Sequence, residues 1–211
     1  MAFDFKKEYK EFYLPPQTPV LVTIPSMHFL AVRGKGDPNE ENGAYSRALN
    51  LLYSVAYLLK MSYRGGYSME GFFEYVVPPL EGLWWQEGSF DMDIRRKGDL
   101  SWISLLRLPD FVTEKDFVWA IAEATRKKKA DFSAVEFFSY DEGLCVQCMH
   151  IGSYDDEPAT IAPMNAFAQT QGYVTDISEH RFHHEIYLSD PQKTEAGKLK
   201  TVLRHPVRKV E

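Results

Sequence analysis

A carboxylate stands between an imidazole and a phenol in the stretch 182–191, whose sequence is FHHEIYLSDP. This pattern predicts a short β-strand that ends at a Ser-Asp-Pro turn. Because side chains alternate along a strand, His183, Glu185 and Tyr187 are expected on one face, with largely apolar side chains on the other. Glu185 could act as a general acid or base there. A glutamate on the open face of an antiparallel sheet is also an ordinary solvated residue, so the stretch alone leaves both interpretations open.

A second stretch, 75–86, has a similar pattern, with Glu81 followed by large side chains at alternate positions up to Trp85. Each of these stretches precedes a strand that carries the pattern L-R-x-P, at 106–109 and at 203–206. The same order of elements, with the same L-R-x-P pattern in both halves, indicates an internal duplication. We therefore expect Glu81 and Glu185 to face one cleft from the two halves.

Hydrophobic periodicity and turn residues predict the elements between these landmarks. Helices are expected at 4–13, 44–61, from 113 onward, and from 158 to about 170. Strands are expected at 20–33 with an interruption at Pro25, at 75–86 and 100–108 joined by a connection over 88–99, within 135–151, within 182–188, and at 199–207.

These elements predict an α+β fold, a tandem βαββ repeat with a pseudo-twofold axis. Its antiparallel sheet would carry helices on one face and a ligand cleft on the other. The chain is expected to form one domain over 1–211, with an N-terminal extension (1–19), a first half (20–112), and a linker helix with the second half (113–211). Aromatic side chains on an open sheet face favour a ligand site, and the cleft is expected to be lined by Trp85, Trp102, Tyr187 and Tyr154.

The composition narrows the class of protein. The 211 residues are 45% hydrophobic and 14% aromatic, enough for a folded core, and the net charge is -6. No apolar run is long enough to cross a bilayer and the N-terminus is too charged for a signal peptide, so a cytoplasmic protein without a membrane partner is expected. The basic run 126–129 ends a predicted helix, where cations complement the helix dipole, so we expect no nucleic-acid partner.

Two patterns that could bind metal are weak. Cys145 and Cys148 form a C-x-x-C on a predicted strand, where residues three apart face opposite sides, so buried reduced thiols are expected. His183 and His184 also face opposite sides, which makes a poor chelate with His180. The sequence therefore predicts no metal and no cofactor.

Several stretches together resemble the GyrI-like small-molecule-binding proteins, and in particular stand-alone bacterial members of about this length. They extend from about residue 20 to 207, nearly the whole chain. They are GKGDPN (34–39), PPLEGLWW (78–85), LPDFVT (108–113), EGLCVQ (142–147), MHIGSYD (149–155), HEIYLSDP (184–191) and LKTVLRHP (199–206).

The resemblance implies the duplicated βαββ fold. In the wider family, effector domains of multidrug-responsive regulators bind cationic lipophilic drugs at a cleft glutamate. Members of the stand-alone branch are hydrolases that open the cyclopropane of DNA-alkylating cyclopropanoid antibiotics inside an aromatic cage. Residues 1–19 are too short for a DNA-binding domain, which favours the stand-alone branch.

For this chain the expected function is therefore binding, and hydrolysis, of bulky planar aromatic xenobiotics. The expected catalytic residues are Glu185 and Tyr154. The expected ligand-binding residues are Glu81, Trp85, Trp102, Tyr187, His183 and the loop tyrosines Tyr63 and Tyr67. Two alternatives remain open, a non-catalytic drug-binding or sequestering protein and a protein that modulates gyrase. A monomer or weak homodimer is expected.

Overall fold

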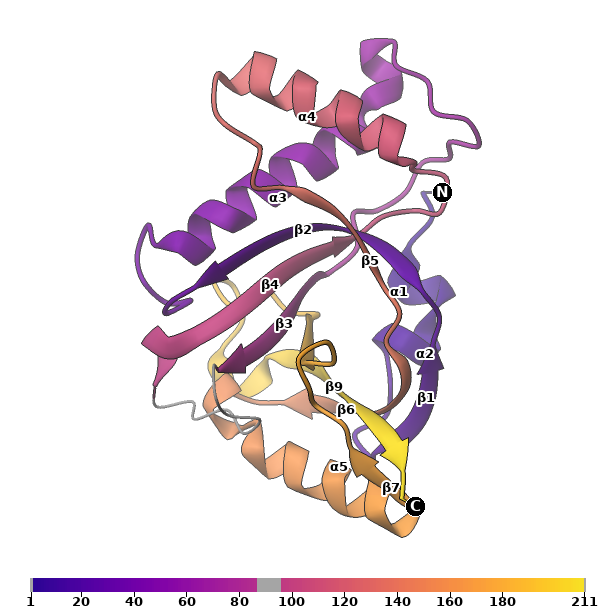
Figure 1. Cartoon of the computed structure of the whole chain (residues 1–211), viewed down its shortest axis with the longest axis vertical. Helices are drawn as coiled ribbons and strands as arrows, with labels where there is room; N and C mark the ends of the chain where they lie inside the picture. Colours follow the sequence, from indigo (N-terminus) through magenta and orange to yellow (C-terminus); the bar gives the residue numbers. More distant parts are fainter. Residues whose placement is uncertain (1, 87–95, 211) are drawn as a thin grey trace.

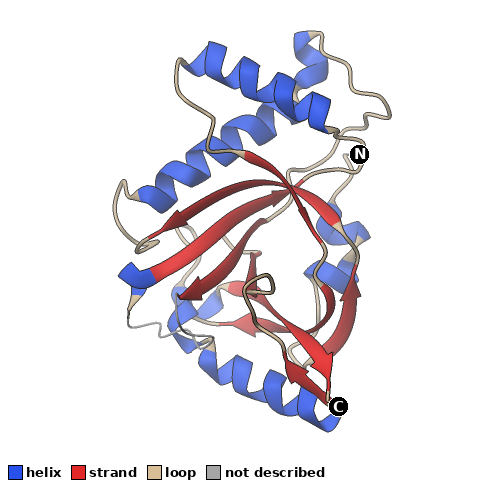
Figure 2. Cartoon of the chain, in the orientation of Figure 1, coloured by secondary structure: helices blue, strands red, loops and turns tan. Residues whose placement is uncertain are grey.

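The computed structural model describes residues 2–86 and 96–210 (Figures 1 and 2). Its α-helices are α1 (Phe5–Glu8), α2 (Lys10–Tyr13), α3 (Ala44–Lys60), α4 (Glu114–Lys128) and α5 (Pro158–Thr170). Its strands are β1 (Val20–Ile24), β2 (Met27–Lys35), β3 (Leu80–Gln86), β4 (Leu100–Arg107), β5 (Glu136–Tyr140), β6 (Gly143–Ile151), β7 (Tyr173–Thr175), β8 (His183–Tyr187) and β9 (Lys200–Lys209).

Nine strands form one sheet in the order β1-β6-β9-β8-β3-β4-β2-β5, with β7 paired to β9. The two halves meet where β3 and β8 pair antiparallel at the centre. On either side of this pair the order is symmetric, since β4 corresponds to β9 and β2 to β6. The outermost strands are exchanged, because β1 pairs with β6 of the second half and β5 pairs with β2 of the first. The α+β repeat fold predicted from the sequence is confirmed.

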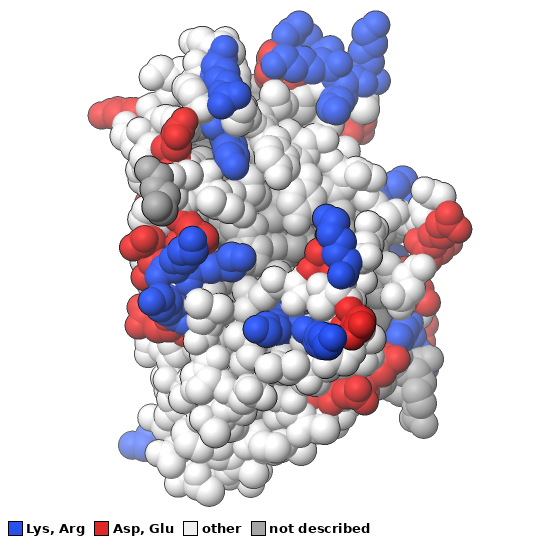
Figure 3. Space-filling model, turned by 180° about the vertical axis from the view of Figure 1, so that it is seen from behind, with Lys and Arg blue, Asp and Glu red and all other residues white. Residues whose placement is uncertain are grey.

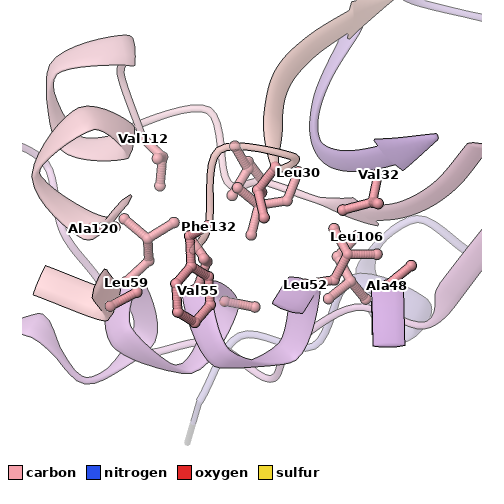
Figure 4. Packing of buried hydrophobic residues seen from close by; sticks show 14 of the residues in the cluster. Leu30, Val32, Ala48, Leu52, Val55, Leu59, Leu106, Val112, Ala120 and Phe132 are labelled. Atoms are coloured by element: carbon pink, nitrogen blue, oxygen red, sulfur yellow. The ribbon is translucent and has the colours of Figure 1, made fainter. Parts of the chain in front are cut away.

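The helices α3 and α5 pack on the same face of the sheet, here called the helical face. Under α3, the core joins Leu52, Val55 and Leu59 to Leu30 and Leu106 (Figure 4). Under α5, Met164 and Ala168 pack on Leu203 and its neighbours. In Figure 1, α3 and α4 lie at one end of the molecule and α5 at the other, with the sheet curving between them.

The opposite face of the sheet, here called the N-terminal face, is covered by α1 and α2. Phe5, Phe12 and Tyr13 are buried there against Leu83 and Ile186 at the centre of the sheet. A cavity of about 10 Å³ between these layers is no larger than about one water molecule. The N-terminal extension therefore fills the face on which we expected the ligand cleft.

Most sequence-predicted elements are confirmed, with a few differences. The predicted helix 4–13 is divided at Tyr9 into α1 and α2. β3 begins at Leu80 because Pro78 and Pro79 cannot donate ladder hydrogen bonds. The short strand β7 was not predicted, and most of the predicted connection 88–99 lies outside the described residues. Cys145 and Cys148 are buried free thiols that pack in separate cores, as predicted.

Charged side chains of both signs lie together on one face of the molecule (Figure 3). Figure 3 shows Lys and Arg interspersed with Asp and Glu over one face, with the largest basic group at the end of the molecule formed by α3 and α4. The last turn of α4 carries Arg126, Lys127 and Lys128, and Glu123 pairs with the first two. Among the described residues, no helix combines the length and apolar character required to span a bilayer.

Candidate functional site

The register between β3 and β8 decides which side chains share a face. Gly82 pairs with Glu185, whereas Glu81 pairs with Ile186. Directly paired residues point to the same side of a sheet, so Glu81 and Glu185 lie on opposite faces. Our prediction that they look into one cleft is therefore wrong by one residue of register. Glu185 lies on the helical face and Glu81 on the N-terminal face.

Glu185 belongs to a buried group on the helical face that we call the Glu185 cluster, formed by Glu157, His183, Glu185 and His205. The Nε2 atom of His183 lies 3.0 Å from Oε1 of Glu185 and 4.0 Å from Oε2 of Glu157. Nδ1 of His183 lies 2.6 Å from Nε2 of His205 on β9. All four side chains are at most 8% exposed. β8, β9 and the start of α5 thus bring together two carboxyls and two imidazoles.

The two carboxyls of the cluster have no cationic side chain among their described partners. Burial, followed by the charge of Glu185 and a hydrogen bond to it, raises the pKa of Glu157 well above its ordinary value. One carboxyl oxygen of Glu157 is buried without a hydrogen-bond partner among the described residues. A proton on Glu157 limits the pair to one negative charge, and a carboxyl beside a carboxylate offers both an acid and a base.

Aromatic side chains surround the outer edge of this cluster. The hydroxyl of Tyr187 accepts a hydrogen bond of 2.9 Å from the indole Nε1 of Trp84. Tyr154, in a 3₁₀ turn just before α5, stacks edge-to-face on Tyr187 with ring centroids 5.8 Å apart. Tyr45 in the first turn of α3 lies 5.5 Å from Trp84 and 5.1 Å from Trp102 between centroids. The first turn of α3 and the 3₁₀ turn before α5 thus each contribute a tyrosine to the same side of the sheet.

These tyrosines keep their protons at neutral pH. Burial and the charges of Glu185 and Glu157 raise the pKa of Tyr154 to about 12. Burial and Glu185 also raise the pKa of Tyr187 well above its ordinary value. Both phenols can therefore act as hydrogen-bond donors toward an oxygen at the site.

Two glycines provide the space that the tryptophans occupy. A Cβ atom on Gly82 would lie 2.5 Å from Nε1 of Trp84 and 3.0 Å from the hydroxyl of Tyr187. A Cβ atom on Gly34 would lie 2.2 Å from the ring of Trp102. Trp102 itself is 1% exposed, so it packs beneath Tyr45 and does not present its ring to a ligand as predicted.

Besides Glu81, three predicted ligand-binding residues lie away from the Glu185 cluster. Trp85 points to the N-terminal face and packs on Phe182, with ring centroids 5.0 Å apart. Tyr67 stacks on Trp119 and donates a hydrogen bond to Asp116 of α4. Tyr63 donates to Glu74 at the exposed end of α3. The two loop tyrosines anchor the segment after α3, and neither contacts the Glu185 cluster.

Glu81 belongs to a second buried group, here called the ion-pair cluster, formed by Glu81, Glu142, His184 and Arg204. His184 bonds Glu142 at 3.0 Å and Glu81 at 2.9 Å. Arg204 bonds Glu142 at 3.0 Å and donates to the carbonyl of Phe12 in α2. Two cations balance two carboxylates here, which is the condition for a stable buried ionic group.

Sequence reasoning missed Glu157, Tyr45, Trp84 and His205. Glu157 precedes Pro158, the predicted helix start, and an acidic residue at that position is ordinarily explained by the helix dipole. Trp84 was missed because the faces of β3 were assigned one residue out of register. His205 lies within the second L-R-x-P, which had been used only as a marker of the repeat.

The Glu185 cluster also has a donor set that a metal ion could use. Glu157, His183 and Glu185 each offer one ligand atom, and these atoms lie within 4.8 Å of one another. Carboxylate and imidazole together suit zinc and similar divalent ions. No metal was expected at this position from the sequence.

Comparison with known proteins places the chain in a family. The model of the GyrI-like small molecule binding domain matches residues 17–208, so the chain belongs to the GyrI-like family. The family predicted from the sequence is thereby confirmed, as is binding of a small molecule as its general property.

Solved structures agree with this assignment. An uncharacterized conserved protein from Listeria innocua is 46% identical, with a TM-score of 0.91 over 98% of this chain and 100% of that one. A hydrolase from Listeria innocua is 44% identical, with a TM-score of 0.89 over the same shares. The EcmrR C-terminal domain has the same fold at 14% identity, with a TM-score of 0.57 over 92% of this chain and 98% of that domain. No curated protein matches the chain.

Proposed function

We propose that this protein binds planar aromatic cyclopropanoids on the helical face and hydrolyses their cyclopropane ring. The observation that carries the proposal is the buried pair of Glu157 and Glu185, which has no cationic side chain among its described partners and lies beside several aromatic side chains. The resemblance to stand-alone family members suggests the substrate class, and the similarity to a Listeria hydrolase is consistent with catalysis.

In the proposed reaction, water adds across one carbon–carbon bond of the cyclopropane. Glu185 accepts a proton from the water as its oxygen attacks the ring CH₂ group. The bond that breaks leaves its electron pair on the conjugated dienone, whose oxygen takes a proton from Glu157 and becomes a phenol. The proton on Glu185 then returns to Glu157, so the pair ends as it began.

The aromatic side chains supply binding and orientation in this scheme. Stacking of an aromatic ligand contributes about 0.5–1.5 kcal/mol per ring contact beyond burial. Trp84, Tyr45 and Tyr187 are the residues proposed to contact the planar ring system. Tyr154 is proposed to donate a hydrogen bond to the dienone oxygen and to stabilise the charge that develops there.

The test is incubation of the wild-type protein with a cyclopropane-bearing indole substrate in isotopically labelled water. Hydrolysis predicts loss of the dienone absorbance and one labelled oxygen in the product. Glu185→Gln and Glu157→Gln should each abolish most of the turnover, whereas Glu136→Gln, an exposed carboxyl on β5, should not.

A binding-only protein gives a different result. The same compound would raise the unfolding temperature saturably, and it would be recovered unchanged after long incubation with the wild type. That outcome would overturn hydrolysis and leave ligand sequestration as the function.

A further inference from the structure

His205 is the member of the Glu185 cluster that lies furthest from its carboxyls, because it reaches Glu185 only through His183. Its Nε2 atom lies 2.6 Å from Nδ1 of His183, and the Nε2 atom of His183 lies 3.0 Å from Glu185. His205 is 3% exposed, and its Nδ1 atom has no hydrogen-bond partner among the described residues. The three side chains therefore form one row, His205–His183–Glu185. Each of its two contacts is a hydrogen bond that needs one hydrogen atom, carried by one of the two partners.

The direction of this row can be derived from its two ends. An ionised Glu185 can only accept, so His183 must carry its hydrogen on Nε2 to bond it. At the other end, a hydrogen on Nδ1 of His205 would leave a buried N–H without an acceptor, and such orphan donors are rare. Both ends thus require His205 to carry its hydrogen on Nε2 and to donate it to Nδ1 of His183.

We propose that His205 is a positioning residue that fixes the tautomer of His183, so that the Nε2–H of His183 is held toward Glu185 and not toward Glu157. This inference rests on the proposed function for its catalytic consequence but not for its structural content. It explains how two adjacent carboxyls receive different roles, since Glu185 alone is bonded by the imidazole row. Burial, followed by the neighbouring His183, lowers the pKa of His205 to about 3, which is consistent with a neutral ring.

The structural test uses the wild-type chain with ¹⁵N-labelled histidine and long-range ¹H–¹⁵N NMR correlation near neutral pH. His183 and His205 are both expected as neutral Nε2–H tautomers. His150 serves as an internal reference, because its Nε2 lies 3.0 Å from the carbonyl oxygen of Ser153, which can only accept. An Nδ1–H tautomer at His205, or a doubly protonated His183, would overturn the proposal whether or not the protein is an enzyme.

The functional test compares His205→Phe with His205→Gln. Phenylalanine removes the donor, so His183 can present an unprotonated Nε2 to Glu185 and the acidic limb of the kcat–pH profile should move to higher pH. Loss of such a supporting hydrogen bond typically costs about 10-fold or more, here expected in kcat at neutral pH with KM little changed. Glutamine retains an N–H donor and should restore most of the activity and the profile.

The pH profile must be read against the other groups that face the two imidazoles. They are Glu185 and Tyr187 on β8, and Tyr154, Asp155 and Glu157 before α5; Glu142, just before β6 on the other face, acts on His205 only through its charge. All of these groups are the same in the two variants. A difference between the two pH profiles therefore reports the loss of the N–H donor at position 205. Equal profiles for His205→Phe and wild type, or a glutamine variant as impaired as phenylalanine, would overturn the positioning role. Absence of wild-type turnover would remove the proposed function, and the NMR result would still decide the tautomer.

Discussion

His183 and His184 are neighbours in the chain, yet each lies in a separate buried cluster with two glutamates. On the N-terminal face, His184 bonds Glu81 and Glu142, and Arg204 adds a second cation. On the helical face, His183 bonds Glu185 beside Glu157, and the next partner is the neutral His205.

The difference in compensating charge separates a structural group from a reactive one. Burial opposes ionisation of Glu142, but His184 and Arg204 outweigh it and lower the pKa of Glu142 to about 2. Burial and Glu185 together raise the pKa of Glu157. The N-terminal face is also closed by α1 and α2, whereas the helical face carries the partly buried tyrosines Tyr45, Tyr154 and Tyr187. Similar residues thus stabilise the fold on one face and can exchange protons on the other.

The largest effect is expected from removing charge in the ion-pair cluster. Glu142→Gln leaves two buried cations with one carboxylate, so the free energy of unfolding should fall by about 3 kcal/mol or more. Urea denaturation measures this change. Glu195→Gln, which removes an exposed partner of Lys198, is the matched control and should change stability by less than about 1 kcal/mol. Equal effects of the two substitutions would contradict the comparison.

The next effect concerns catalysis on the helical face. Glu185→Gln should lower kcat by roughly 100-fold, equivalent to about 2.7 kcal/mol in the activation barrier. Stability should change little, since an amide occupies the same volume. Steady-state turnover and thermal unfolding measure the two quantities. A variant that unfolds easily but retains its kcat per folded molecule would assign Glu185 to structure.

A steric change at Gly82 should disturb the aromatic side chains without altering any charge. The added methyl of Gly82→Ala would displace Trp84 or the hydroxyl of Tyr187, at a cost of about 1–2 kcal/mol in stability and a raised KM. Gly98→Ala, where a Cβ meets no atom within 4 Å, is the control. Unchanged ligand affinity in Gly82→Ala would separate these side chains from the binding site.

The opposite pKa shifts on the two faces predict opposite pH dependences of stability. Glu142 has a lowered pKa, so its contribution is complete above about 4.5 and is lost as the pH falls toward about 2. Glu157 has a raised pKa, so its folded state is favoured at low pH and loses stability as the pH rises above about 4.5.

Glu157→Gln tests the second of these dependences. The variant should equal the wild type at pH 5 and exceed it by about 1 kcal/mol at alkaline pH, because the wild type must ionise a buried carboxyl. Denaturation curves across pH measure the difference. A variant that is less stable at alkaline pH would show that the ionised carboxyl is compensated.

The smallest effect is expected from metal removal. Because the proposed reaction uses only a proton shared by Glu157 and Glu185, EDTA should leave turnover unchanged within error. Metal analysis of the purified protein and activity before and after chelation provide the measurement. Loss of activity with EDTA and recovery with added Zn²⁺ would contradict this mechanism. It would indicate that a metal ion bound to Glu157, His183 and Glu185 supports the reaction in place of the shared proton.

Much of the fold follows from local signals in the sequence. The stripe of Leu52, Val55 and Leu59 is sufficient for α3, and Thr113 with Asp116 forms the capping box that begins α4. The two L-R-x-P patterns correctly indicate the duplication, and both of their arginines, Arg107 and Arg204, are buried. Alternation along 183–187 correctly separates Glu185 from His184.

The composition of the site depended on tertiary structure, because it is set by pairing between distant strands. A single residue of register between β3 and β8 exchanges Trp84 for Trp85 and removes Glu81 from the face of Glu185. The sequence alone determined that Glu185, His183 and Tyr187 would share a face. The approach of Glu157, Tyr45 and His205 was decided by how α5, α3 and β9 pack, and no local pattern encodes a contact over that separation.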